Sequence, residues 1–300
     1  MLPFNGTRVS TVFSSVFALC IGSAAYSAEP KRVAYPSTDP FTKMRIGDIS
    51  IAAHLWKPAG NGPFATIIAV HGCNGPGRYM DGWIQRFQQW GYVVARPNSL
   101  QPRGLSTTCT SKAERAERVR PGASPFPTGA EFSKKITRIN PQQRVYDVAD
   151  TLRYLQTLPF VDKERVAVVG WSHGGDTAVL AAEEYSSKSA FDGIAPSLRG
   201  VVSFYPMCYF LAPPKFKTPL LVLVGDKDEW ASAGNCERHV KQRQSMDVVA
   251  DVVVYPNTYH GFDSPGANVT IFGYRVLYNE KAHRDAIERV RRFLSEVFRR

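Results

Sequence analysis

Short runs of apolar residues alternate with helical patterns along most of this chain. The first run, residues 65–70, lies between Pro63 and Gly72 and shows no alternation of polar and apolar side chains. Such a run predicts a strand that is buried on both faces, as the strands of a parallel sheet are. Because strands and helices alternate, we expect an α/β fold with a doubly wound, mostly parallel sheet and helices on both faces.

The later segments repeat this order. A helix near Trp83 ends at Gly91, and Asn140-Pro141 supplies a cap and a first-turn proline for another helix. Residues 49–56 predict an antiparallel strand at the edge of the sheet. The other expected strands are 92–95, 165–170, 200–204, 220–224 and 251–255, and the other expected helices are 173–185, 236–246 and one around 286–297.

The first 28 residues have the pattern of a secretory signal peptide. Arg8 is followed by an apolar segment at 9–22 and by small residues that end at Ser27 and Ala28, where we expect cleavage. A buried N-terminal helix is the alternative. Cys20 follows Leu19 rather than a small residue, so we expect no lipid anchor once the signal is removed. The mature chain is then exported, to the periplasm or the medium.

Removal of the signal leaves an even number of cysteines, which in an exported chain suggests disulfides. Cys73 and Cys109 follow two strands that are expected to be neighbours, and so do Cys208 and Cys236. We therefore expect the pairs Cys73–Cys109 and Cys208–Cys236, although four cysteines allow three pairings. Free buried thiols are the alternative.

The composition is that of an ordinary globular protein. Hydrophobic residues make up 44% and charged residues 21% of the 300 residues, which excludes a disordered, collagen-like or coiled-coil chain. The net charge of +11 permits loose attraction to polyanions. Basic residues are not interleaved with aromatic ones as in nucleic-acid modules, so we expect no nucleic-acid partner.

We expect one domain, residues 29–300, with a basic insertion at about 98–140. The insertion holds eight basic and three acidic residues and shows no clear strand. Segments of this length are usually functional or mobile. The insertion is therefore either a rim over the functional site or a solvated excursion on the surface.

Gly170-Trp171-Ser172-His173-Gly174 matches the pattern G-x-S-x-G between a predicted strand and a predicted helix. In that context the pattern forms a sharp turn that lifts a nucleophilic serine above the sheet, and small residues flank it because the backbones come close. A tight turn with an idle serine is the alternative. We expect Ser172 to be the nucleophile.

A serine nucleophile needs a base, and in this architecture an acid and then a histidine follow it along the chain. Asp228 follows the strand at 220–224, and His260 follows the strand at 251–255. We expect His260 to act as general base and Asp228 to orient it. Asp226, directly after the strand, is the competing acid.

Two backbone N–H groups must also stabilise the oxyanion. His173 supplies one as the residue after the nucleophile, and Cys73, in the glycine-rich loop after the first predicted strand, supplies the other. The alternatives are an ordinary glycine loop and a nucleophilic Cys73 thiol, which a disulfide would silence. Three tryptophans could line an apolar substrate pocket, namely Trp171, Trp83 and Trp230.

Four motifs in this order resemble the dienelactone hydrolase family of the α/β-hydrolase fold: His71-Gly72-Cys73-Asn74-Gly75, Gly170-Trp171-Ser172-His173-Gly174-Gly175, Gly225-Asp226-Lys227-Asp228 and Tyr259-His260-Gly261-Phe262. The resemblance implies a triad of Ser172, Asp228 and His260, with no metal and no organic cofactor. The namesake enzymes use a cysteine nucleophile and are typically cytosolic, whereas this chain has Ser172 and an export signal.

These departures favour a general carboxylic-ester hydrolase, active on small esters or lactones through an acyl-enzyme, over one specific for dienelactone. An acyltransferase with the same triad is the main alternative, and a peptidase of the same fold is another. The sequence leaves the natural substrate and the oligomeric state open.

Overall fold

The computed structural model describes residues 29–38, 49–114, 138–183, 190–195, 198–208, 215–243 and 247–299. The expected signal peptide and the part of the insertion at 115–137 lie outside these ranges. The strands are β1 (Lys31–Pro36), β2 (Ser50–Trp56), β3 (Phe64–Val70), β4 (Val93–Asn98), β5 (Val161–Trp171), β6 (Gly200–Phe204), β7 (Leu220–Gly225), β8 (Ala250–Tyr255), β9 (Asn268–Ile271) and β10 (Tyr274–Leu277). The helices are α1 (Asp81–Gln89), α3 (Pro141–Leu155), α4 (His173–Ala182), α6 (Ala233–Arg243) and α7 (Glu280–Val297), with short 3₁₀ turns at Arg78–Met80 and Gln101–Arg103.

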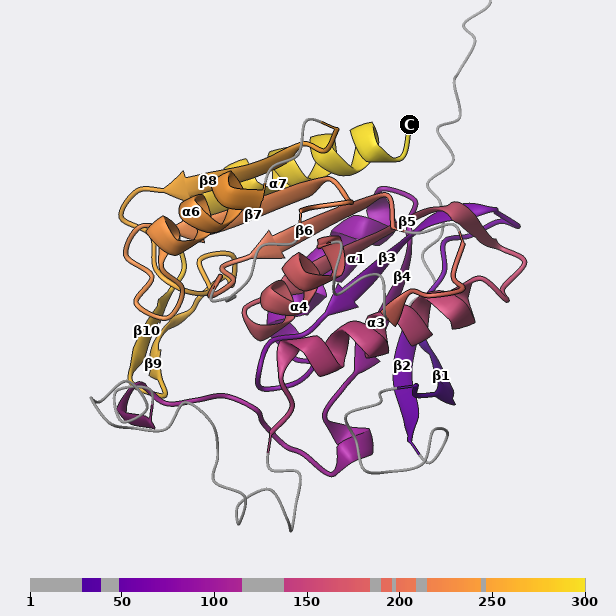
Figure 1. Ribbon diagram of the computed structural model, residues 1–300, viewed down its shortest axis with the longest axis horizontal. Coiled ribbons are helices and arrows are strands. Elements are labelled where there is room, and N and C mark those ends of the chain that lie inside the picture. The colour runs from indigo at the N-terminus through magenta and orange to yellow at the C-terminus, as the bar shows by residue number, and fades with distance from the viewer. Residues whose placement is uncertain are drawn as a thin grey trace, which may run out of the picture.

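Eight of the strands form one sheet in the order β1-β2-β4-β3-β5-β6-β7-β8 (Figure 1). From β4 to β8 all neighbours are parallel, and β2 is antiparallel to both β4 and β1. The expected α/β-hydrolase architecture, with a mostly parallel sheet, is therefore confirmed. The carboxyl ends of the parallel strands meet at one edge of the sheet, where sites in such folds are built.

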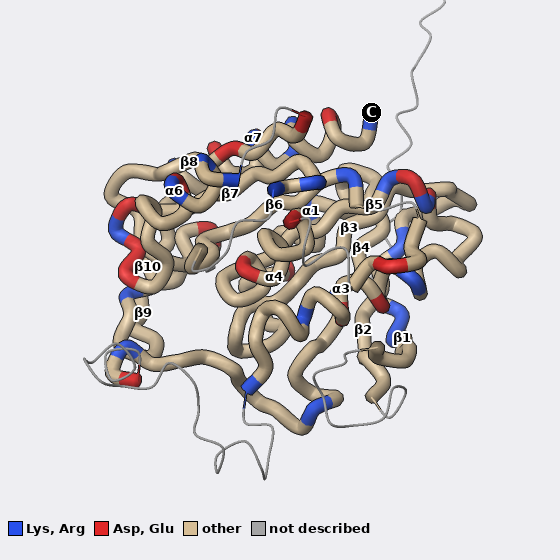
Figure 2. The backbone as a smooth tube through the Cα atoms, viewed as in Figure 1, with Lys and Arg blue, Asp and Glu red and all other residues tan. Residues whose placement is uncertain are grey.

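Helices cover both faces of the sheet, and β3 shows why its sequence is apolar throughout. Successive side chains of a strand point to opposite faces. Ile67 belongs to the core cluster that contains residues of α1 and α7, whereas Ile68 belongs to the cluster that contains residues of α3, α4 and α6. The inner strands β3, β6 and β7 carry neither acidic nor basic residues (Figure 2). Both faces of the sheet are therefore buried cores.

Two expectations about the strands need correction. Segment 49–56 forms β2, which is antiparallel as expected, but it is not the edge strand, because β1 pairs outside it. The β9–β10 hairpin has no counterpart among the strands expected from the sequence. Both missed elements carry weak sequence signals, since β1 contains Lys31, Arg32 and Pro36 and the two hairpin strands have only four residues each.

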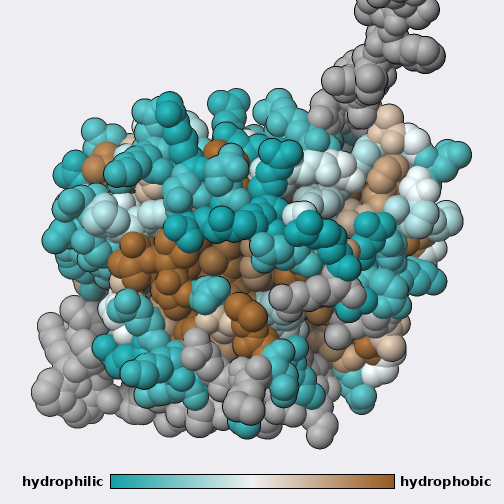
Figure 3. All heavy atoms as spheres, turned by 90° about the horizontal axis from the view of Figure 1, so that it is seen from above, coloured by the Kyte–Doolittle hydropathy of each residue, from teal (hydrophilic) through white to brown (hydrophobic). Residues whose placement is uncertain are grey.

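At its other end the sheet finishes with β8, which pairs only with β7 among the described strands. Seen from above, where this edge comes to the surface, apolar side chains gather in a band between polar margins (Figure 3). Val249, just before β8, is 51% exposed. Within the described ranges, no helix has the length and apolar character needed to cross a bilayer.

Candidate active site

Ser172 lies on the sharp turn between β5 and α4. Its backbone has φ 54° and ψ −120°, a conformation that L-residues rarely adopt. The Ser172 N–H donates to the Phe204 carbonyl of β6 (2.9 Å), and the Ser172 carbonyl accepts from the Asp176 N–H (2.9 Å). Strand and helix therefore both hold the turn, and the strained conformation aims the hydroxyl away from the sheet.

The two glycines of the G-x-S-x-G motif are required for steric reasons. A Cβ on Gly170 would lie 2.0 Å from the Gly174 carbonyl oxygen, and one on Gly174 would lie 2.2 Å from that of Val70. Both distances are far below van der Waals contact, and both obstacles are backbone atoms that cannot move aside. The G-x-S-x-G pattern is thus a packing requirement of the crossing between β3, β5 and α4.

The structure brings Ser172, His260 and Asp228 together. The Nε2 atom of His260 lies 3.0 Å from Ser172 Oγ, and Nδ1 lies 2.7 Å from Asp228 Oδ2. Because a carboxylate only accepts hydrogen bonds, Nδ1 is the donor to Asp228, and Nε2 is the ring atom that faces the Ser172 hydroxyl. The three side chains come from segments that follow β5, β7 and β8.

Backbone contacts fix the acid and the histidine. Asp228 Oδ1 accepts from the N–H groups of Trp230 and Ala231, both at 2.8 Å, which leaves Oδ2 for His260. The His260 carbonyl accepts from the Leu277 N–H (3.2 Å), so the β9–β10 hairpin supports the histidine. Asp226, the competing acid, instead accepts from the Thr258 N–H (3.2 Å).

The loop after β3 faces the nucleophile turn and is itself held by a tyrosine. The Gly72 N–H donates to Tyr79 Oη (2.6 Å), and the Tyr79 hydroxyl donates to the Gly75 carbonyl (3.1 Å). Burial raises the pKa of Tyr79 to about 12, so the phenol remains a donor at neutral pH. The N–H groups of Cys73 and His173 donate to no other described residue, which leaves both available to a ligand.

A buried polar cluster lies behind this loop. The fully buried Arg144 of α3 donates from Nη2 to the His71 carbonyl (2.7 Å), from Nη1 to His173 Nδ1 (2.9 Å) and from Nε to Ser99 Oγ (3.2 Å). Burial lowers the pKa of Arg144 to about 10, so the guanidinium is still charged at pH 7. No sequence signal points to Arg144, because an arginine next to the apolar stripe of a helix usually faces solvent.

The pKa values of His71 and His173 both lie well below the usual value of 6.5, chiefly because burial removes hydration and secondly because of the Arg144 charge. Both rings are therefore neutral near pH 7. The pKa of His173 is partly restored by a hydrogen bond to the Ile139 carbonyl, which its Nε2–H makes while Nδ1 accepts from Arg144.

A second buried carboxylate lies beneath the triad. Asp263 Oδ2 accepts from the indole N–H groups of Trp83 (2.8 Å) and Trp171 (2.9 Å), and Oδ1 accepts from the Tyr205 hydroxyl (2.8 Å). The Tyr205 ring lies 4.4 Å from the His260 ring, measured between centroids. Asp263 directly follows the motif Tyr259-His260-Gly261-Phe262, but no local pattern in the sequence marks it as a buried carboxylate.

This arrangement corrects the expectation that Trp83 and Trp171 line a substrate pocket. The two side chains are 1% and 0% exposed and pack with Phe204 in the core between the sheet and helices α1 and α7. Their indoles are committed to Asp263. They support the site from beneath and present no surface to a substrate.

Trp230 lies differently, beside the catalytic histidine proposed from the sequence. Its ring is 5.0 Å from that of His260 and stacks on Tyr274 at 4.5 Å. Phe272, 39% exposed, meets Trp230 edge-on at 6.3 Å. Cys73 and Cys109 belong to the same apolar cluster. An apolar wall, consisting of Trp230, Tyr274, Phe272 and the two cysteines, therefore borders the site.

The structure joins the cysteines as Cys73–Cys109 and Cys208–Cys236, with Cα–Cα distances of 4.8 and 5.1 Å. The strands that precede them, β3 with β4 and β6 with β7, are indeed neighbours in the sheet. No cluster of three or more histidine, cysteine or acidic side chains suited to a metal ion occurs within the described ranges.

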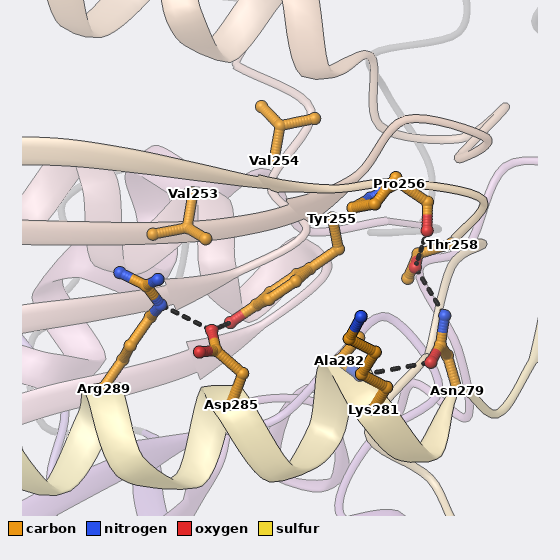
Figure 4. A pocket seen from close by; sticks show the side chains of 10 residues that line it. All are labelled: Val253, Val254, Tyr255, Pro256, Thr258, Asn279, Lys281, Ala282, Asp285 and Arg289. Atoms are coloured by element: carbon orange, nitrogen blue, oxygen red, sulfur yellow. Dashed lines mark hydrogen bonds and ion pairs between the residues drawn. The ribbon is translucent and has the colours of Figure 1, made fainter.

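A separate cavity of about 290 Å³ lies between β8 and α7 (Figure 4). Tyr255 and Arg289 both point at Asp285 there, with a hydrogen bond of 2.9 Å from the tyrosine hydroxyl. None of Ser172, His260 and Asp228 lines this cavity.

Several known proteins are similar to this chain. A relative from Synechocystis that bears the name "Putative carboxymethylenebutenolidase" is 23% identical over 81% of this chain and 91% of its own length. A dienelactone hydrolase-like promiscuous phosphotriesterase from metagenomic libraries superposes with a TM-score of 0.60 at 16% identity, and the alignment covers 90% of this chain and 99% of that one. A propionate-bound esterase from Thermogutta terrifontis gives a TM-score of 0.57 at 12% identity, with 90% and 95% coverage.

At such identities the superpositions establish the fold alone. The assignment to a family comes from the sequence, since residues 51–298 match the model of the dienelactone hydrolase family. That match extends from β2 to the end of α7 and includes every residue of the site. The chain therefore belongs to the dienelactone hydrolase family of carboxylic-ester hydrolases.

Proposed function

We propose that this chain hydrolyses small carboxylic esters, lactones included, through a covalent acyl-enzyme on Ser172. The observation that carries the proposal is the continuous hydrogen-bonded line from Ser172 Oγ through His260 to Asp228, with distances of 3.0 and 2.7 Å. A serine hydroxyl is a weak nucleophile until an adjacent base takes its proton. His260, with its proton fixed on Nδ1, is that base.

In the first half of the reaction, Ser172 Oγ attacks the ester carbonyl carbon while His260 Nε2 takes the hydroxyl proton. The resulting imidazolium is stabilised by Asp228. The tetrahedral intermediate collapses, the carbonyl–alkoxy bond breaks, and His260 returns the proton to the leaving alcohol. In the second half, His260 deprotonates a water molecule that attacks the acyl-enzyme, and Ser172 leaves with the proton.

The negative charge of both tetrahedral intermediates falls on the former carbonyl oxygen. We assign the backbone N–H groups of Cys73 and His173 as its donors. Neither N–H has another acceptor among the described residues, and His173 opens α4, where unpaired N–H groups and the helix dipole favour negative charge.

The apolar wall supports an acyl or alcohol group of apolar or aromatic character. A Trp230→Leu variant should raise KM for p-nitrophenyl benzoate more than for p-nitrophenyl acetate, because the benzoate has a ring to place against the wall. Equal changes in KM for the two esters would contradict a substrate contact at Trp230.

The central experiment compares Ser172→Ala with Ser232→Ala, which alters a serine at the start of α6. Turnover of p-nitrophenyl acetate should fall about 10⁴-fold or more in Ser172→Ala and stay near the wild-type rate in Ser232→Ala. A fluorophosphonate should label the wild-type chain on the peptide that carries Ser172. Full turnover in a folded Ser172→Ala variant would disprove the assignment.

An acyltransferase would use the same residues but pass the acyl group to an alcohol or amine. Product analysis in the presence of added alcohols separates the two activities, because a hydrolase releases mainly the free acid. Predominant transfer to the added alcohol would replace hydrolysis as the main function.

We also infer that the chain works in an oxidising compartment, after removal of residues 1–28. The two cysteine pairs within disulfide distance support this inference. Expression of the full chain in a bacterium should yield a mature product in the periplasm that begins near Ala28 or Glu29, as read by N-terminal sequencing. An uncleaved cytoplasmic product would oppose it.

A further inference from the structure

Both segments that carry the proposed oxyanion donors are held by one buried guanidinium. Arg144 donates to the carbonyl of His71, two residues before Cys73, and to the side chain of His173. We propose that Arg144 is a positioning residue of the oxyanion hole, which fixes the spacing of the Cys73 and His173 N–H groups and places a positive charge behind them. This inference rests on the proposed ester hydrolysis.

The contacts form a closed circuit. His173 accepts from Arg144 at Nδ1 and donates to the Ile139 carbonyl from Nε2. The Thr108 hydroxyl donates to the same carbonyl (2.8 Å) and accepts from the Ile139 N–H (3.1 Å), and the Thr108 N–H donates to the Cys73 carbonyl (2.9 Å). We call Arg144, His173, Ile139 and Thr108 the oxyanion clamp, because they connect the two donor segments through side chains and backbone.

Among the residues that the structure describes, Arg144 donates its hydrogen bonds to no carboxylate. Its three hydrogen-bond acceptors, the His71 carbonyl, His173 Nδ1 and Ser99 Oγ, are all neutral. The nearby Asp147 is instead engaged by Arg103 in two hydrogen bonds of 2.8 and 3.0 Å. A buried charge acts on a developing oxyanion more strongly than a charge in solvent does, and the neighbouring Asp147 offsets only part of it.

The clamp also gives a reason for the histidine in the nucleophile motif. A neutral imidazole can accept on one nitrogen and donate on the other, which is what the Arg144 and Ile139 contacts require. An apolar residue at 173 would leave the Arg144 Nη1–H without its acceptor, at a cost that is large for a buried charged donor.

Arg144→Met removes the charge and the forked contacts while it keeps the volume. We expect kcat for p-nitrophenyl acetate to fall roughly 10- to 100-fold, because a small displacement of the donors has an effect of that size, while KM stays within about 3-fold. Arg144→Lys keeps the charge but cannot reach both segments, so its kcat should lie between those of the wild type and Arg144→Met. Arg153→Met, on the same helix but bonded to Asp150, is the matched control and should retain the wild-type kcat.

A residue that only stabilises the fold would not move the affinity for a transition-state mimic. Phenylboronic acid forms a tetrahedral anion on a reactive serine, so its Ki should rise in Arg144→Met by the same factor by which kcat/KM falls. Titration with a fluorophosphonate gives the concentration of active sites and removes any contribution from unfolded protein. Unchanged kcat and Ki per active site would overturn the proposal.

If Arg144→Met does not fold, variants of His173, the other partner in the clamp, test the proposal. His173→Gln keeps an acceptor for Arg144, whereas His173→Leu does not, and both keep the backbone N–H. We expect kcat in His173→Leu to fall at least about 10-fold below that of His173→Gln. Equal kcat values in the two variants would overturn the proposal.

The outcomes separate this inference from the proposed function. If wild-type activity does not depend on Ser172, the proposed ester hydrolysis fails. If activity depends on Ser172 but the Arg144 and His173 variants keep their kcat and their boronate affinity, only the clamp fails.

Discussion

Asp263 accepts a 2.9 Å hydrogen bond from the indole of Trp171, the residue directly before Ser172. The same carboxylate holds Trp83 and the Tyr205 hydroxyl, and the Tyr205 ring lies against His260. This one buried carboxyl group thus connects the nucleophile turn with the segment that carries His260. Its three donors are neutral, as a carboxylate with full hydrogen-bond satisfaction permits.

An Asp263→Asn variant should therefore lose both stability and activity. The amide retains one acceptor oxygen but turns an N–H₂ group toward buried donors, so we expect the free energy of unfolding to fall by about 2–4 kcal/mol. We also expect kcat to fall about 10-fold, since the nucleophile turn and the base lose a common support. Urea unfolding and steady-state kinetics measure the two effects, and Asp251→Asn, an exposed carboxylate on β8, is the control.

Asp228→Asn and Asp226→Asn form a matched pair for the identity of the acid. We expect kcat of Asp228→Asn to fall about 10³- to 10⁴-fold, because an amide no longer fixes the proton of His260 on Nδ1. Asp226 contacts the Thr258 N–H rather than the histidine, so its variant should lose less than about 10-fold. The reverse order would transfer the role to Asp226.

The buried histidines predict a loss of stability in acid. The pKa values of His71 and His173 are well below 6.5 in the folded chain and return to about 6.5 on unfolding. Below that pH the unfolded state binds protons that the folded state does not, so the free energy of unfolding falls by about 1.4 kcal/mol per pH unit for each histidine. The contribution is fully present above about pH 6.5 and is lost as the pH falls.

Urea titrations between about pH 5 and pH 7 test this slope. His173→Gln cannot take up the proton, and its slope should be smaller than that of the wild type by about 1.4 kcal/mol per pH unit. Parallel curves for the two proteins would show that His173 is not responsible.

We expect both disulfides to stabilise the fold but only the Cys73–Cys109 disulfide to affect kcat. They close segments separated by 36 and 28 residues, and removal of either should lower the free energy of unfolding by about 3–4 kcal/mol. Only Cys73 carries a proposed oxyanion donor. We therefore expect kcat to fall in the Cys73→Ala/Cys109→Ala variant and to persist in Cys208→Ala/Cys236→Ala, measured below the unfolding transition of both. Equal kcat values in the two variants would show that the Cys73–Cys109 disulfide has no special role in the active site.

The sequence predicted the parallel sheet well because its strands are buried on both faces and need no long-range information to be recognised. The motif at Ser172 is equally local, since the positions of Gly170 and Gly174 follow from steric limits within one turn. By contrast, β1 is a charged strand whose position depends on its pairing with β2, and the β9–β10 hairpin depends on its contact with His260.

The residues that support the site from α3 and from the core could not be predicted from local sequence patterns. On α3, Arg144, Asp147 and Thr151 follow helical spacing beside the apolar stripe, and such a row usually faces solvent. This row of side chains is buried because residues 71, 99, 103 and 173, which lie far away in the chain, contact it. Similarly, nothing local distinguishes Trp83 and Trp171, which donate to Asp263 in the core, from Trp230 beside the base.

The two hydrogen bonds of the His173 ring restrict which substitutions evolution can accept at this position. Position 173 is formally a variable letter of the nucleophile motif, yet here its side chain already has one partner on α3 and another at Ile139. A substitution at 173 that removes the acceptor leaves the buried Arg144 guanidinium without one of its hydrogen bonds, unless residue 144 is replaced as well. We therefore expect positions 144 and 173 to covary among homologues of this chain.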